Sequence, residues 1–548
     1  MSTVLPIGTI SCLDDRWLTH RIMKLEPINQ PIQQLEKHHL LAAGYADDEQ
    51  LPVLLEAATD YARRGIHGKK YLLKLLARDF GEPVPGLPMR EDPLPLAEAL
   101  QAITAEEKAN LAQVRKQMQR LTRVPVIHAA AIMPDACPTG GGDAVMPVGG
   151  VVVARQAIIP SAHSSDICCS MFSTFYEERS SIAAELDALT SATRFGPSHR
   201  HLDDLVHHPV LEENVWLNPF LHGLKDRAHA HLADQGDGNH FAFIGEMEIT
   251  DALLQQLRDA GYDELFTALA VFPLGKKIRA LVTHHGSRGL GAHVYKRGQI
   301  AAEKHTARAG RHIPEAGAWL DAKSDVGRDY WDALQYVSRW TRANHECIHA
   351  RFLERISGTA TAQWGNEHNF VWKRGDDFYH GKGATPAWLD ETGRPLLGLI
   401  PLNMAEPILL VLGRNSEKML GFAPHGAGRN LSRTALRRQY PGDQAKELAI
   451  RKSTAGIDVR WYCGKPDLSE TPIAYKNAAR IREQIEHFAL AQIIAEIQPL
   501  GCIMAGDSGR SWRDRDEELT PKQKRQIKHR AERRKVKRHL GCVDDDDD

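Results

Sequence analysis

The stretch IRALVTHHGSRG, residues 278–289, has a pattern that recurs through most of the chain: a short apolar run that ends in a glycine-rich turn. Such runs, bounded by glycine, are typical of buried strands. Five further stretches share the pattern: VIHAAAIM (126–133), GGVVVARQAIIP (149–160), HFAFIGEMEI (240–249), LLGLIPL (396–402) and ILLVLG (408–413). Helical stretches lie between them. The sequence therefore predicts one large α/β (α+β) domain with mixed sheets, over residues 113–506.

The segments that flank this domain differ from it. Residues 1–112 include LEKHHLLAAGYA and YLLKLLARDF, whose helical spacing of apolar residues predicts a helical N-terminal extension. The proline-rich stretch 81–95 predicts a linker or loop. Thr104 and Glu107 have the spacing of a capping box, which predicts a helix over about residues 104–123.

Residues 507–548 are predicted to form a separate tail. Ten Lys or Arg residues and one acid lie between Lys522 and Arg538, and five aspartates end the sequence. The basic run is either a solvated surface helix or an arm that binds phosphate.

Composition excludes several classes of protein. Hydrophobic residues make up 42% of the chain and charged residues 25%, which is typical of a globular protein rather than a disordered one. The net charge of -1 excludes a uniformly basic coat for nucleic acid, but not a local basic patch. We find neither an unbroken apolar run of about 18 residues nor a signal peptide, so no membrane partner is expected. The eight cysteines are scattered apart from Cys168 and Cys169, which favours a reducing, cytoplasmic location.

Five segments concentrate side chains that bind metals or phosphates: residues 166–171, 236–241, 284–289, 367–385 and 425–433. In the first, strand geometry would pair Asp166 with Cys168, whereas a tight turn would pair it with Cys169. Each segment alone is a weak signal, because the chain has 27 histidines and buried structural cysteines are common. Together they suit metal-assisted phosphoryl or nucleotidyl transfer. The chain has neither a G-x-S-x-G elbow nor a Walker A loop.

In their residues and in their order along the chain, these segments resemble the RtcB family of RNA ligases. The resemblance covers roughly residues 113–506 and rests on MPDACPTGGG, IIPSAHSSDICCSM, GDGNHF, HHGSRGLG, EHNF, GKGAT, HGAGRNLSR, TPIAYKN and QPLG. HGAGR-x-x-SR and GSRGLG are the most specific of these motifs. The resemblance implies an RtcB-like fold, with mixed sheets around a central cleft that holds two metal ions.

The resemblance also implies an activity in RNA repair or splicing. RNA ends with a 3'-phosphate or 2',3'-cyclic phosphate would be joined to 5'-hydroxyl ends, with GTP and two Mn(II) ions as cofactors. His425 would attack GTP and carry GMP, and the family's D-x-x-C spacing selects Cys169 as the bridging thiolate. The implied metal ligands are Asp166, Cys169, His240, His284 and His368. Manganese comes from the resemblance, since the spacing alone would also allow zinc.

The implied nucleotide-binding residues are Asn239, Phe241, Asn369, Pro401, Asn403, Gly426, Ala427, Gly428, Arg429 and Tyr475. Among them, Tyr475 would pack on the base. Arg288 and Lys382 would face RNA or triphosphate oxygens.

Several positions depart from the family pattern. The family usually reads N-H-F-x-E, but the fifth position here is Phe243, and Met504 stands near the place of a lysine that usually follows P-L-G. The resemblance implies that those two family residues read the guanine edge. We therefore expect altered or relaxed nucleotide choice, including ATP, unless Glu246 compensates. The usual D-x-H-x-G also differs, because Cys137 replaces its histidine.

Two other functions compete with ligation. One is a nucleotidyltransferase or cyclic phosphodiesterase that acts on damaged RNA. The other is a non-catalytic RNA-binding protein with structural metals, against which the retained His425 argues. An activating protein partner is compatible with each enzymatic function.

Overall fold

The structure is a computed structural model that describes residues 35–45, 49–83, 86–140, 144–196, 200 and 204–507. Its contacts form two units, Met1–Val84 and Pro85–Asp548. The predicted basic run and the terminal aspartates lie outside the described residues.

The smaller unit is a short helical module. Its helices are α1 (Lys37–Ala42), α2 (Gln50–Arg63) and α3 (Lys69–Phe80). Leu40, Leu72 and Leu76 are fully buried in its core, where α2 packs against α3. The helices α1 and α3 confirm the helical pattern of LEKHHLLAAGYA and YLLKLLARDF.

The larger unit contains an eight-stranded sheet with the order β13-β6-β10-β9-β21-β18-β17, in which β20 also pairs with β21. Its strands are β6 (Ser170–Tyr176), β9 (Phe241–Glu248), β10 (Lys277–His285), β13 (Ala362–Glu367), β17 (Leu397–Ile400), β18 (Ile408–Gly413), β20 (Asp458–Trp461) and β21 (Ala491–Met504). Neighbouring strands are antiparallel, except that β20 is parallel to β21. Four of the predicted apolar runs are strands of this sheet.

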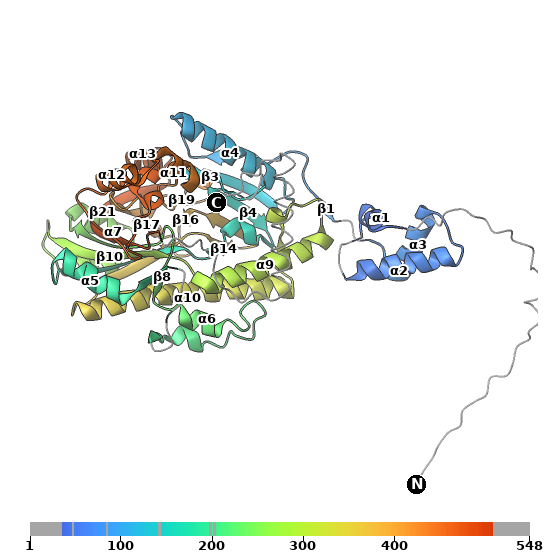
Figure 1. Cartoon of the computed structure of the whole chain (residues 1–548), viewed down its shortest axis with the longest axis horizontal. Helices are drawn as coiled ribbons and strands as arrows, with labels where there is room; N and C mark the ends of the chain where they lie inside the picture. The colour runs from blue at the N-terminus through green and yellow to red at the C-terminus, as the bar shows by residue number, and fades with distance from the viewer. Residues whose placement is uncertain are drawn as a thin grey trace, which may run out of the picture. The chain divides into compact units, whose positions relative to one another are not determined.

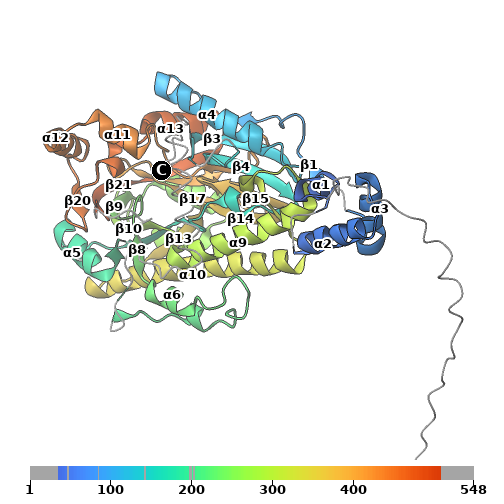
Figure 2. The ribbon, with the colours of Figure 1, turned by 45° about the vertical axis from the view of Figure 1, so that its right-hand side comes forward.

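A five-stranded sheet has the order β14-β15-β4-β3-β2. Its strands are β2 (Ala97–Glu98), β3 (Ile127–Cys137), β4 (Val148–Arg155), β14 (Phe370–Arg374) and β15 (Asp377–Lys382). Helix α4 (Ala105–Leu121) contacts β3, as Figure 2 shows, and begins with the predicted capping box at Thr104. Because β2 pairs with β3 and α4 contacts β3, residues 86–112 belong to the larger unit, although the sequence assigned them to the N-terminal extension.

Short strand pairs and further helices complete the larger unit (Figure 1). The pairs are β1 (Leu87–Pro88) with β11 (Gly310–Arg311), β5 (Ala157–Ile158) with β12 (Leu320–Asp321), β7 (Arg194–Phe195) with β8 (Asp234–Gly236), and β16 (Ala384–Pro386) with β19 (Phe422–Pro424). The helices are α5 (Ile182–Ala192), α6 (Lys225–Ala230), α7 (Asp251–Asp259), α8 (Asp263–Leu269), α9 (Arg288–Ala309), α10 (Asp325–Arg355), α11 (Arg433–Gln439), α12 (Asp443–Ser453) and α13 (Ala478–His487). Among the described residues, no helix combines the length and the apolar character that a membrane crossing requires.

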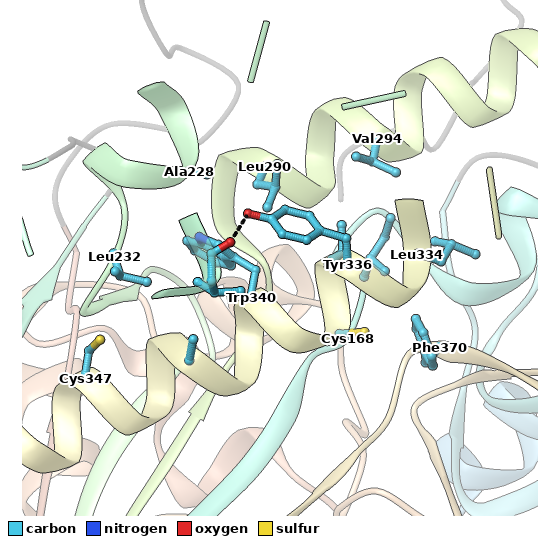
Figure 3. Packing of buried hydrophobic residues seen from close by; sticks show 14 of the residues in the cluster. Cys168, Ala228, Leu232, Leu290, Val294, Leu334, Tyr336, Trp340, Cys347 and Phe370 are labelled. Carbon is cyan, nitrogen blue, oxygen red and sulfur yellow. Dashed lines mark hydrogen bonds between the residues drawn. The ribbon is translucent and has the colours of Figure 1, made fainter. Parts of the chain in front are cut away.

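The eight-stranded sheet has a hydrophobic core on each face, because side chains alternate along a strand. On the first face, Leu281 packs with residues of α5, α9 and α10, and Figure 3 shows Trp340 and Tyr336 of α10 in this core. The Tyr336 hydroxyl donates a hydrogen bond to the Val210 carbonyl at 3.1 Å. On the second face, Phe243 and residues of α7 form another core. His284 is an even number of residues from Val282 of the second core, so it lies on that face.

Replacing Leu281 by Ala should lower the free energy of unfolding by about 2–5 kcal/mol, because it leaves a cavity in the first core. Leu217 is 83% exposed, so Leu217→Ala is a matched control that should change stability by about 0.5 kcal/mol or less. Urea denaturation of the two variants measures both changes, and equal losses would contradict the assignment of Leu281 to the core.

Candidate active site

Four neighbouring strands of the eight-stranded sheet share one end. Because they are antiparallel, β6 and β9 begin where β10 and β13 finish. Cys169 precedes β6, His240 precedes β9, His368 follows β13, and His284 is the next-to-last residue of β10. Strand pairing thus gathers four side chains that are far apart in the sequence.

These side chains and Asp166 form a compact ligand set. The Cys169 Sγ lies 3.1 Å from His284 Nε2 and 3.6 Å from His240 Nε2. His240 Nε2 lies 2.9 Å from Asp166 Oδ2, and His284 Nε2 lies 3.0 Å from His368 Nε2. Two groups of three ligands result, Asp166–Cys169–His240 and Cys169–His284–His368, and they share Cys169. The set therefore fits two divalent cations with a bridging thiolate, and its donor types suit manganese or zinc.

A tight turn determines which cysteine joins the set. Cys168 has φ +55°, and the Cys169 N–H donates to the Asp166 carbonyl at 3.3 Å. Cys168 consequently points into the first core, beside Phe370 in Figure 3, while Cys169 points to the ligands. The residue pattern left open whether Asp166 is paired with Cys168 on a strand or with Cys169 across a tight turn. The structure shows the turn, with Cys169 beside Asp166. Gly286 allows this approach, because a Cβ there would overlap the Asp166 carboxylate.

Burial controls the charge of the ligands. It lowers the pKa of His284 to about 3 and that of His368 well below its usual value, so both imidazoles are neutral at pH 7. Burial and then Asp166 raise the pKa of the Cys169 thiol. Burial opposes ionisation of Asp166, but His240 and Arg288 outweigh it and hold the pKa of that carboxyl below its usual range. A bound cation would therefore displace the proton of Cys169, while His284 and His368 would bind it as neutral imidazoles.

His425 follows β19 and lies next to the ligand set. Its Nδ1 is 2.6 Å from Oδ2 of Asp135, a fully buried residue of β3. A carboxylate can only accept, so Nδ1 carries the proton and Nε2 has a free lone pair. The ring centres of His425 and His368 are 5.0 Å apart. The arrangement thus holds an oriented imidazole beside the candidate ligand set.

Asp135 was not among the predicted site residues. Its signal was its place in MPDACPTGGG, but only the fold shows which histidine it contacts.

A pocket extends from His425 and His284. All the predicted nucleotide-binding residues line it: Asn239, Phe241, Asn369, Pro401, Asn403, Gly426, Ala427, Gly428, Arg429 and Tyr475. Gly428 has φ +69°, and a Cβ there would overlap the carbonyl of Asp135. A larger residue at 428 would therefore push the loop away from β3 and separate His425 from its carboxylate partner.

The two predicted RNA-facing cations have different positions. Lys382 lines the pocket, where its Nζ donates to the Met146 carbonyl at 2.9 Å and to the Thr139 hydroxyl at 3.2 Å. Arg288 differs from the prediction: it is 9% exposed, and its Nη1 lies 3.1 Å from His240 Nδ1. Because Arg288 begins α9 with φ +54°, its side chain lies behind a metal ligand instead of lining the pocket.

A buried carboxylate, Glu470, holds one wall of the pocket. It forms ion pairs with Arg429 at 2.6 Å and with Arg433 at 2.9 Å, and it accepts a hydrogen bond from the Tyr475 hydroxyl at 2.9 Å. Glu470 therefore neutralises Arg429 and fixes the ring of Tyr475. Sequence reasoning missed it, because its place just before TPIAYKN carries no pattern that identifies its partners.

Phe243 and Met504 both line the pocket. These are the two positions where the chain departs from the family residues that are expected to read the guanine base. They come from the adjacent strands β9 and β21, on which Met504 is opposite Phe241. Glu246 does not line the pocket, since it lies on the other face of β9 and accepts a hydrogen bond from Lys277 Nζ at 2.7 Å. The predicted compensation by Glu246 is therefore wrong.

Comparisons with known proteins agree with the motifs. The model of the family described as tRNA-splicing ligase RtcB matches residues 212–505. The RNA-splicing ligase RtcB2 of Escherichia coli is 27% identical over 422 residues, which are 74% of this chain and 96% of that protein. The tRNA-splicing ligases RtcB of Pyrococcus furiosus and Archaeoglobus fulgidus are each 26% identical over half of this chain. Those matches cover 30% and 60% of the two archaeal proteins.

Replacing Cys169 by Ala should weaken Mn(II) binding at least about tenfold, because both ligand groups lose their shared sulfur. Cys168→Ala is the matched control and should leave the affinity unchanged, since that side chain lies in the first core. Calorimetric titration of Mn(II) into each variant measures the difference. Equal affinities in the two variants would rule out Cys169 as a ligand.

Proposed function

Since the chain belongs to the RtcB family, we propose that it joins RNA 3'-phosphate or 2',3'-cyclic phosphate ends to 5'-hydroxyl ends through a nucleotidyl group on His425. Family membership supports RNA ligation as the class of activity. The observation that carries the finer proposal is the Asp135–His425 pair beside His368.

In the first step, His425 Nε2 attacks the α-phosphorus of a nucleoside triphosphate, GTP in the family's pattern. The N–P bond forms as the P–O bond to pyrophosphate breaks. Asp135 keeps the imidazole oriented through Nδ1–H and stabilises its positive charge. Two Mn(II) ions bound by the five ligands would neutralise phosphate charge during this displacement.

The later steps transfer the nucleotidyl group to RNA. An oxygen of the RNA 3'-phosphate attacks the phosphorus on His425, and the imidazole leaves as the free base. The RNA 5'-hydroxyl then attacks the activated 3'-phosphate, loses its proton and displaces the nucleoside monophosphate. A cyclic phosphate is first hydrolysed to a 3'-phosphate.

This proposal explains more of the site than its competitors do. A non-catalytic RNA-binding protein needs no imidazole that a buried carboxylate orients. A cyclic phosphodiesterase could use such an imidazole as a general base, but it needs no nucleotide pocket beside it. A nucleotidyltransferase would share the first step and differ in the acceptor. A cytoplasmic location and an activating protein partner stay predictions.

Incubation with α-labelled GTP and Mn(II) should label the wild-type protein, and His425→Ala should abolish the label. Asp135→Asn should slow labelling at least about 100-fold, because the imidazole loses its carboxylate partner. The exposed Asp263→Asn is the matched control and should label at the wild-type rate. Denaturing gels measure the covalent label. A label that persists in His425→Ala would contradict the proposed nucleophile.

Triphosphate binding should weaken as the pH rises past about 8. Burial lowers the pKa of Lys382 from 10.5 to about 8, so this pocket cation loses its charge in a range where an exposed lysine keeps it. Lys382→Arg keeps the charge, and its affinity for a non-hydrolysable GTP analogue should fall less over the same range. Fluorescence titrations at a series of pH values compare the two proteins. Parallel pH profiles would show that Lys382 is not the group responsible.

A further inference from the structure

We infer that the pocket accepts nucleoside triphosphates without strong selection for the base, because the part of the pocket that would contact the base is an apolar wall. The wall consists of Phe241, Phe243, Met404, Ile408 and Met504. The inference rests on the proposed function, since it concerns the nucleotide that would modify His425.

The wall belongs to the rigid part of the fold. Phe241 and Phe243 lie on the same face of β9, and their ring centres are 6.4 Å apart. Met504 of β21 lies opposite Phe241. Phe243, Ile408 and Met504 are each 1–2% exposed and are also part of the second core. Burial in the second core therefore restrains these side chains where they line the pocket.

One end of the wall, Phe241, lies beside the proposed metal ligand His284, and the wall continues along β9 to Phe243. Phe241 pairs with His284 across β9 and β10, and their ring centres are 5.2 Å apart, whereas Phe243 pairs with Val282. A nucleotide with its α-phosphate at His425 therefore has its phosphates at the ligand end. Its base extends toward Phe243 and Met504.

The charged residues that line the pocket already have partners. Glu470 is the only carboxylate among the described lining residues, and Arg429, Arg433 and Tyr475 engage it. The Nζ of Lys382 donates to the Met146 carbonyl and the Thr139 hydroxyl. The donors on the guanine edge thus meet no free carboxylate, and O6 meets no free cation at the wall.

The consequence for selectivity follows from the difference between apolar and polar recognition. A site that hydrogen-bonds a polar group rejects an analogue without it by about 10⁴-fold or more, whereas an apolar pocket discriminates by about 100-fold or less. Aromatic rings stack on any base. We therefore expect GTP and ATP to modify His425 with second-order rate constants that differ by less than about 100-fold.

The test uses the full chain with Mn(II) and each of the four α-labelled nucleoside triphosphates. A label from both GTP and ATP, within about 100-fold, is the expected result. A larger preference for either purine would overturn the inference and leave the proposed function intact. Failure of all four to label the protein would overturn the proposed function, and the inference with it.

Variants of the wall test its position independently. Phe243→Glu supplies a carboxylate for the guanine donors and should raise the GTP-to-ATP ratio at least about tenfold, whereas Phe243→Leu keeps the wall apolar and should not. Met404→Glu provides the same carboxylate from a second position, in the loop before β18, where the side chain is 6% exposed compared with 1% for Phe243. Thermal melting identifies any variant that fails to fold. If folded glutamate variants of both positions keep the wild-type ratio, the wall does not contact the base and the inference fails.

Discussion

The antiparallel pairing of β13, β6, β10 and β9 is the constraint on which the site depends. It brings a thiol and three imidazoles to one end of a sheet, although they are separated by up to about 200 residues of sequence. Burial keeps the imidazoles of His284 and His368 neutral and raises the pKa of the Cys169 thiol, whose proton a bound cation would displace. The sheet therefore holds a preformed set of donors that fits divalent cations, and it keeps these buried polar groups in place.

The position of His425, the proposed nucleophile, depends on the five-stranded sheet. Asp135 lies in β3 of the five-stranded sheet, and His425 follows β19, which contacts β3. The hydrogen bond between Asp135 and His425 joins β3 to the segment that follows β19, at the pocket. Because β19 pairs with β16, and this strand pair contacts both sheets, the distance from His425 to His368 is set by how the pair packs between them.

The base end of the pocket combines two roles. Phe243 and Met504 fill the second core and also line the pocket, so their apolar character stabilises the fold while it removes polar partners for a base. The apolar wall contains none of the proposed metal ligands and neither member of the Asp135–His425 pair. Nucleotide choice can therefore diverge without altering the residues proposed to carry the chemistry.

The sequence by itself predicted the strands β9 and β10 within the stretches 240–249 and 278–289, the capped helix α4 and the segments that hold the site, because periodicity, capping and glycine-rich turns are local properties. Only the tertiary structure decided which side chains meet. It placed Cys169 among the ligands through a turn at Cys168, a choice that the residue pattern left open and that only the family resemblance implied. It also paired Asp135 with a histidine 290 residues away and directed Arg288 behind His240. Those contacts depend on strand register and on the packing of two sheets, and no local pattern encodes the partner of a residue so distant along the chain.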